Sequence, residues 1–302
     1  MNNMRQGITL LITLSVIATM IALMGVMFKY LDVARGKAEI KASMIQANLL
    51  SADIGRFLRQ ILGKSPSKSK MQTLFETPLA LSTLNGEFRM AIACKPLANR
   101  INIGWLGLGE QSKHARAYTL AASLFDMLTE HANLRDASLL REKIAAALNG
   151  EGRLVFGQPS RINEKKGIIT FKKFREILDS YRYEADDPRV YRIPWQRYFS
   201  FGIREQRIDG DFISPELLAF LYDVEINVVR EDFEMGSLNS FLSNIGESRK
   251  TGGYDAFLFS NSKKALPIAR CSASYSFRKG NYGFAFNYIN GRIEGFEFSG
   301  NQ

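Results

Sequence analysis

The sequence predicts an α+β protein in which a long N-terminal helix packs on an antiparallel sheet, and a large helical insert interrupts that sheet. Three observations predict this arrangement. Residues 8–28 form an apolar run without a charge, residues 111–249 repeat their apolar side chains mainly at helical spacing, and residues 71–110 and 250–302 contain segments of alternating apolar and polar side chains. Helical and alternating periods in separate parts of one chain are typical of the α+β class.

The chain up to residue 62 is predicted to form one continuous helix after its first seven residues. The uncharged run 8–28 spans about 30 Å at the rise of an α-helix, the thickness of the apolar core of a bilayer. Beyond it, apolar side chains recur every seven residues, at Val33, Ile40, Ala47, Ile54 and Ile61. Such a stripe favours packing against a partner surface. No proline interrupts residues 8–62, so we expect one transmembrane and amphipathic rod of about 80 Å.

Strand-like segments lie on both sides of the insert. Before it, residues 87–94 and 100–103 alternate; after it, alternation marks 254–259, 269–278, 282–288 and 292–298. The dipeptide Asn290-Gly291 is a strong signal for a tight hairpin between the last two strands. One face of the strand at 269–278 is expected to pack on the N-terminal helix, and it carries Cys271, Ala273, Tyr275 and Phe277.

The insert is predicted to contain several helices separated by Gly, Pro and Asp clusters. Their ranges are 113–130, 137–148, 171–183, 215–221 and 237–243. Asp136 or Ser138 can cap the second helix, and Ser214 followed by Pro215 is a favourable helix start.

Cys94 and Cys271 fall in predicted strands on opposite sides of the insert. If both strands join one sheet, the cysteines can approach the Cα separation of about 4.4–6.8 Å that a disulfide needs. The bond would close a long loop and would require an oxidising compartment. Two buried free thiols are the alternative, because cysteine is often buried even when it is not bonded.

The sequence lacks the motifs of the common enzyme classes, and we predict no enzymatic activity and no catalytic residue. Residues 63–65 end like a phosphate-binding loop, but Leu58 stands where that motif needs glycine. The two cysteines and two histidines do not have the spacing of a structural zinc site. The net charge of +10 suits either an ordinary basic surface or contact with nucleic acid or anionic lipid.

Acidic clusters in two loops are the candidates for a metal site. One cluster holds Glu184, Asp186 and Asp187; the other holds Asp209, Asp211 and Glu216. Oxygen ligands on a loop suit calcium, and solvated turns are the alternative. No other cofactor is expected.

A group of aromatic residues lies among arginines between residues 181 and 198. Trp195 and its neighbouring tyrosines could hold single-stranded nucleic acid, or they could belong to the core.

The N-terminus resembles the leader of the type IV prepilins and pseudopilins. A short leader, residues 1–7, contains Arg5 and ends in Gly7, and the apolar helix starts directly at Ile8. The resemblance implies that a prepilin peptidase cleaves between Gly7 and Ile8, and that the freed helix packs in a filament core. Major pilins have glutamate as the fifth residue of the mature helix, where this chain has Ile12. Lack of that glutamate is a trait of the minor pseudopilin called general secretion pathway protein K, which caps the filament tip.

Two internal segments are also similar to the K-type pseudopilins. Residues 99–104 (NRINIG) resemble a strand that precedes a helix in that family, and residues 208–224 resemble its second copy. The resemblance implies a pilin-like helix-on-sheet fold with a helical domain inserted into the sheet, and calcium in the soluble part.

The resemblance implies a minor pseudopilin that initiates or caps assembly at the tip of a type II secretion pseudopilus or a competence pilus. It places the chain in the bacterial inner membrane with one span and a periplasmic C-terminal domain. The implied partners are other minor pseudopilins, the inner-membrane assembly platform, the prepilin peptidase and the lipid bilayer, with DNA only in a competence system. The alternative is a single-span membrane protein whose exposed domain binds a ligand or DNA without forming a filament.

The charges that flank the span favour the opposite orientation. Four basic residues follow it closely, namely Lys29, Arg35, Lys37 and Lys41, and only Arg5 precedes it. Positive-inside counting would therefore place the large domain in the cytoplasm. We follow the leader pattern, because pilins enter the membrane with short tails and carry basic residues along the exposed rod.

Overall fold

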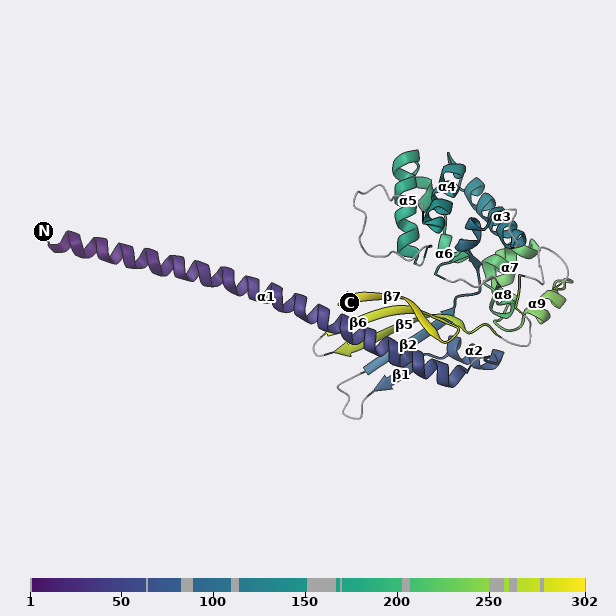
Figure 1. Ribbon diagram of the computed structural model, residues 1–302, viewed down its shortest axis with the longest axis horizontal. Helices are drawn as coiled ribbons and strands as arrows, with labels where there is room; N and C mark the ends of the chain where they lie inside the picture. Colours follow the sequence, from purple (N-terminus) through teal and green to yellow (C-terminus); the bar gives the residue numbers. More distant parts are fainter. Residues whose placement is uncertain are drawn as a thin grey trace.

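The structure, a computed structural model, combines one long helix, a five-stranded antiparallel sheet and a helical insert (Figure 1). It describes residues 2–63, 65–82, 89–109, 114–150, 167–168, 170–202, 207–249, 258–260, 265–277 and 280–301, without the side chains of residues 2–12, 277, 300 and 301. This architecture confirms the predicted α+β class, with a long N-terminal helix on an antiparallel sheet and a helical insert.

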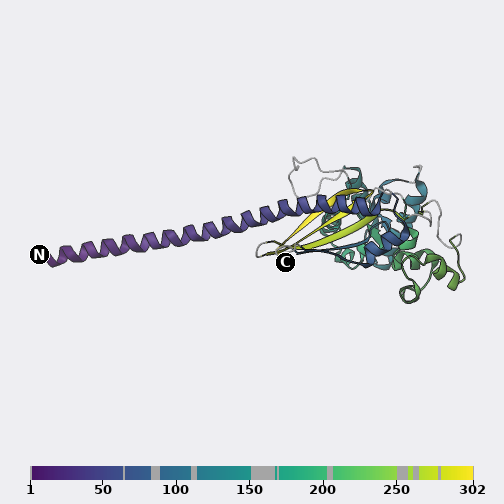
Figure 2. The same ribbon diagram turned by 90° about the horizontal axis from the view of Figure 1, so that it is seen from below.

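Helix α1 (Asn2–Leu62) leaves the sheet as an extended rod, and its N-terminus lies far from the rest of the chain (Figure 1, Figure 2). It ends where the sequence predicts, because Gly63 adopts the left-handed conformation (φ 68°) that closes helices. The amide of Gly63 donates to the carbonyl oxygen of Arg59 at 2.9 Å. A single helix therefore contains both the apolar run and the apolar stripe.

The sheet has the order β1-β2-β5-β6-β7, and every neighbouring pair is antiparallel. Its strands are β1 (Leu79–Ser82), β2 (Arg89–Pro96), β5 (Ile268–Phe277), β6 (Gly280–Ile289) and β7 (Arg292–Asn301). Asn290 and Gly291 both have positive φ, 49° and 86°, as a two-residue hairpin turn requires, so the predicted hairpin is confirmed. The chain leaves the sheet after β2 and returns at β5, the adjacent strand.

The C-terminal third of α1 packs on one face of this sheet. Its buried residues follow each other at spacings of three and four, at Ser43, Ala47, Ser51, Ile54, Leu58 and Leu62. The apolar residues of this set share a core with Cys271, Ala273 and Tyr275, as the strand pattern predicts. The Tyr275 hydroxyl donates to the Ser43 carbonyl oxygen at 2.6 Å. This bond ties the middle of α1 to the centre of the sheet.

Gly55 allows α1 to approach β7 closely. A Cβ atom at this position would lie 2.7 Å from the Ile293 side chain, which is too close for any larger residue without movement of that side chain. At the end of the same contact, the Arg59 guanidinium donates to the Gly291 carbonyl oxygen.

The insert has its own core and lies toward the end of the molecule that is remote from the α1 N-terminus (Figure 1, Figure 2). Its helices are α3 (Ala115–His131), α4 (Ala137–Asn149), α5 (Phe171–Ala185), α6 (Trp195–Tyr198), α7 (Pro215–Tyr222), α8 (Ile226–Asp232) and α9 (Leu238–Asn244). Aromatic side chains contribute to this core: the Trp195 ring centroid lies 5.8 Å from that of Phe125 and 5.4 Å from that of Phe174. The predicted caps Asp136 and Ser214 each accept a hydrogen bond from a backbone amide in the first helical turn.

Several elements differ from the sequence predictions. Residues 68–76 form α2 (Lys68–Glu76), a helix that the sequence did not indicate; it buries Met71 and Leu74 in the core beneath the sheet. The strand expected at 100–103 is reduced to β3 (Ile101–Asn102), which pairs in parallel with β4 (Phe199–Ser200) and not with the main sheet. Of the strand expected at 254–259, residues 254–257 lie outside the described residues, and Phe259 forms an isolated bridge to Ile208.

Candidate functional site

The part of α1 beyond the sheet exposes a continuous apolar surface. Large apolar side chains point outward from Leu14 to Leu31, and most are more than half exposed. In the described part of the chain, α1 is the one helix long and apolar enough to cross a membrane. The Thr19 hydroxyl donates to the carbonyl oxygens of Ser15 and Val16, so it needs no water. This surface is suited to lipid or to apolar side chains of other helices.

The structure divides the predicted stripe between two environments. Val33 and Ile40 are 50% and 49% exposed, and Ile61 is 44% exposed. Ala47 and Ile54 are buried against the sheet of the same chain. Ile54 belongs to the core of the domain, so a charge at this position would destabilise the domain itself. Val33 and Ile40 remain available to a partner.

The predicted processing residues lie near the start of α1. Gly7 and Ile8, together with Ile12, which is predicted to pack against neighbouring helices, fall within its backbone range, and their side chains lie outside the described residues. Cleavage after Gly7 stays a prediction.

Cys94 and Cys271 occupy directly opposed positions on β2 and β5 and are joined by a disulfide with an S–S distance of 2.02 Å. Both are buried in the core under α1. Because β2 leads into the insert and β5 follows it, the bond closes the base of the insert across a sequence separation of 177 residues.

Two carboxylates of the first acidic cluster, those of Asp187 and Glu184, form ion pairs with cationic side chains. The buried Asp187 carboxylate accepts from the Arg189 guanidinium at 2.7 and 2.9 Å and from the Arg135 amide at 2.8 Å. The Arg189 hydrogen bonds hold the pKa of Asp187 well below its usual range. Its stabilising contribution is therefore present above the ordinary pKa of aspartate and is lost as the pH falls toward the lowered value. Glu184 pairs with Lys143, and Asp186 ends α5 in the left-handed conformation.

The second acidic cluster connects the insert to the sheet and to α2. Asp211 accepts from Arg249 at 2.6 Å and from Lys68 at 2.5 Å. Asp209 accepts from the Leu266 amide at 2.8 Å, and its own amide donates to the Ala98 carbonyl oxygen. Burial raises the pKa of Asp209 to about 6. The sequence did not reveal these links, because their partners are distant in the chain.

This arrangement does not fit a calcium site at either loop. Asp187 and Asp211 already bind arginine or lysine, and Glu216 pairs with Arg230 at 3.1 Å. Among the described residues, no group of three His, Cys, Asp or Glu side chains converges as metal ligands would.

The aromatic group around Trp195 belongs to the core. Trp195 and Tyr181 are buried, and the Trp195 indole donates to the Val190 carbonyl oxygen at 3.0 Å. Tyr183 and Tyr191 are exposed, by 78% and 40%. The hypothesis that this aromatic group binds single-stranded nucleic acid is wrong for Trp195 and Tyr181, because both side chains are buried.

Comparison with known proteins identifies the fold. No family model and no curated protein sequence matches the chain. Among solved structures, the chain is similar to a chain in the crystal structure of the GspK-GspI-GspJ complex from the type 2 secretion system of enterotoxigenic Escherichia coli. The similarity has a TM-score of 0.53 and covers 87% of this chain and 99% of that chain, with 11% sequence identity. The chain has a pseudopilin-like fold.

The pseudopilin-like fold accounts for the two environments of α1. The sheet covers residues 43–62 of the helix, and the preceding part extends from the domain with its apolar side chains exposed. The insert is an addition between β2 and β5 that leaves the helix-on-sheet unit intact.

Proposed function

We propose that this protein is a minor pseudopilin, anchored in the bacterial inner membrane by α1 with its C-terminal domain in the periplasm, and that it works by assembly and not by catalysis. The observation that carries the proposal is the division of α1, which is apolar and uncovered up to Leu31, while its residues 43–62 are built into a pseudopilin-like domain. An uncovered apolar helix suits a bilayer before assembly and neighbouring subunits afterwards. Other minor pseudopilins are the partners that this surface fits.

We further propose a position at the tip of a type II secretion pseudopilus or a competence pilus, where the protein initiates or caps assembly. Two features support it. Ile12 stands where major pilins have the glutamate that meets the subunit above, and a tip subunit, which has no subunit above it, has no use for that glutamate. The insert adds bulk at the end remote from the α1 N-terminus, where a further subunit would have to be added (Figure 1).

Processing after Gly7 tests the family assignment. We expect the mature protein from a strain with an active prepilin peptidase to begin at Ile8, as read by N-terminal sequencing. Gly7→Phe should leave the precursor uncut, because the peptidase requires a small residue before the cleaved bond. Gly36→Leu is the matched control, since a Cβ at Gly36 meets nothing within 4 Å, and it should be processed normally. An uncut Met1 start in the wild type would support a single-span binding protein instead.

Partner packing tests the assembly surface. Ile40 is half exposed and is not part of the domain core, so Ile40→Lys should leave thermal unfolding of the domain unchanged. Its charge would have to be buried between helices, so we expect at least tenfold less co-purification of the other minor pseudopilins. Ala38→Lys adds the same charge on another face of α1 and serves as the control. Unchanged co-purification with Ile40→Lys would contradict the proposed surface.

A further inference from the structure

A basic pocket lies between the sheet and the insert, on the side of the sheet opposite α1. Its volume is about 500 Å³, within the range of small-molecule sites. Strands β2, β5, β6 and β7 contribute Lys95, Arg270, Asn287 and Glu297, and the insert contributes residues of α5, α6 and β4. The hydrogen bond from the Ser200 hydroxyl to the Leu97 carbonyl oxygen, 2.6 Å, links the two sides. The pocket exists only where these two parts of the chain meet.

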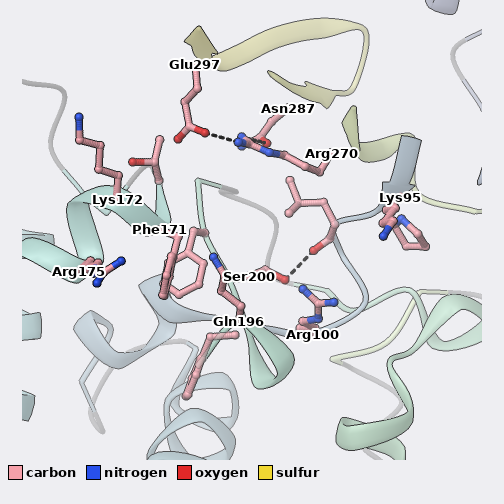
Figure 3. A pocket seen from close by; sticks show the side chains of 15 residues that line it. Lys95, Arg100, Phe171, Lys172, Arg175, Gln196, Ser200, Arg270, Asn287 and Glu297 are labelled. Atoms are coloured by element: carbon pink, nitrogen blue, oxygen red, sulfur yellow. Dashed lines mark hydrogen bonds and ion pairs between the residues drawn. The ribbon is translucent and has the colours of Figure 1, made fainter. Parts of the chain in front are cut away.

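Five cationic side chains surround this space, and one carboxylate faces them. Figure 3 shows Lys172 and Arg175 of α5 on one side, with Lys95 and Arg100 on the other. Arg270 pairs with Glu297 and also donates to Asn287 at 3.0 Å. In the described part of the chain, the other four cations have no carboxylate within ion-pair distance. The pocket therefore carries a net charge of about +4 from the groups that line it.

Arg100 is the strongest sign that this group of charges can bind an anion. Its Nε atom is buried and has no hydrogen-bond partner among the described residues. Burial lowers the pKa of Arg100, and the Glu216 carboxylate opposes this shift only in part, which means that the positive charge is poorly solvated in the free protein. A buried cationic donor without a partner destabilises the structure unless an anion binds there.

We propose that this pocket binds a small anion with at least two negative charges on phosphate groups. A single carboxylate would neutralise only one of the four unpaired cations, whereas a compact phosphate ligand offers several charged oxygens to arginine forks. The N-terminus of α5, capped by Thr170 at the pocket wall, adds a favourable field for such an anion. Phe171 and Phe201, in edge contact at 5.4 Å, provide an apolar wall for an organic part. Binding of an anion in this pocket does not require assembly of a filament.

Calorimetric titration of the full-length protein in detergent with pyrophosphate tests this site. We expect saturable binding of one pyrophosphate per chain. Lys172→Gln and Arg175→Gln should each weaken it about tenfold, because each removes one charged donor from an exposed helix face without touching the core. Glu297→Gln should tighten it, because it removes the one carboxylate of the pocket. Arg56→Gln removes an equal charge from α1, where Arg56 is exposed, and should have no effect.

The variants are compared only where their far-ultraviolet circular dichroism matches that of the wild type, which separates loss of binding from loss of fold. Absence of saturable binding at millimolar pyrophosphate would overturn the proposal. So would equal weakening by Arg56→Gln and Arg175→Gln, which would indicate attraction by net charge alone. Tighter binding of citrate than of pyrophosphate would replace the phosphate class with a polycarboxylate and would also overturn it.

Discussion

Removal of the Cys94–Cys271 disulfide is expected to lower the free energy of unfolding by about 4–5 kcal/mol, because the bond closes a loop of 177 residues. Without the bond, the unfolded chain gains the conformational entropy of that loop. In the folded protein, strands β2 and β5 keep their backbone hydrogen bonds. Urea unfolding of the Cys94→Ala/Cys271→Ala protein, compared with the wild type, measures the difference. Each single variant should lose nearly as much as the double variant, since either one removes the whole bond.

The Cys94–Cys271 bond also tests in which compartment the C-terminal domain lies. Protein that is denatured and alkylated before reduction should show no labelled cysteine by mass spectrometry, because the periplasm that we propose permits disulfides. Two freely labelled thiols in the wild type would contradict both the bond and the periplasmic orientation, and they would favour the cytoplasmic orientation that the flanking charges indicate.

Ile54→Lys is expected to destabilise the domain by about 3–5 kcal/mol. Ile54 is only 3% exposed and lies in the core that α1 shares with the sheet, so a lysine there loses an apolar contact and buries a charge without a partner. Thermal and urea unfolding of the full-length protein in detergent measure the loss.

Two further variants show whether burial is the cause. Ile54→Val keeps the apolar character and should cost about 0.5–1.5 kcal/mol. Ile40→Lys places the same charge on the same helix outside the sheet and should change the free energy of unfolding by less than about 0.5 kcal/mol. Equal unfolding midpoints for Ile40→Lys and Ile54→Lys would show that α1 does not dock on the sheet as described.

Elements formed by near neighbours in the chain could be predicted well. The end of α1 at Leu62, the caps at Asp136 and Ser214, and the hairpin at Asn290 and Gly291 depend on local backbone preferences. Helix α2 was not predicted, because its formation depends on residues that are distant in the chain. Its first residues are lysine and serine, and its stability comes from burial of Met71 and Leu74 against the distant sheet.

The candidate sites were less accessible to prediction. The sequence pointed to Cys94 and Cys271 but could not decide whether they bond, because the register of β2 on β5 sets them opposite each other. It grouped Asp209 with Asp211 but gave no sign of Lys68 and Arg249. The basic pocket had no sequence signal, since its cations come from β2, the β2–β3 connection, α5 and β5.

By itself, the sequence determined the long apolar helix, the alternating strands around a helical insert, and the leader pattern of residues 1–7. Each of these depends on residue order and spacing alone. Only the tertiary structure decided that Ala47 and Ile54 face the sheet while Val33 and Ile40 stay exposed, although all four lie on one heptad stripe. A repeat of apolar side chains marks a helix face that needs a partner, and the partner is chosen by which other surface the folded chain brings against it.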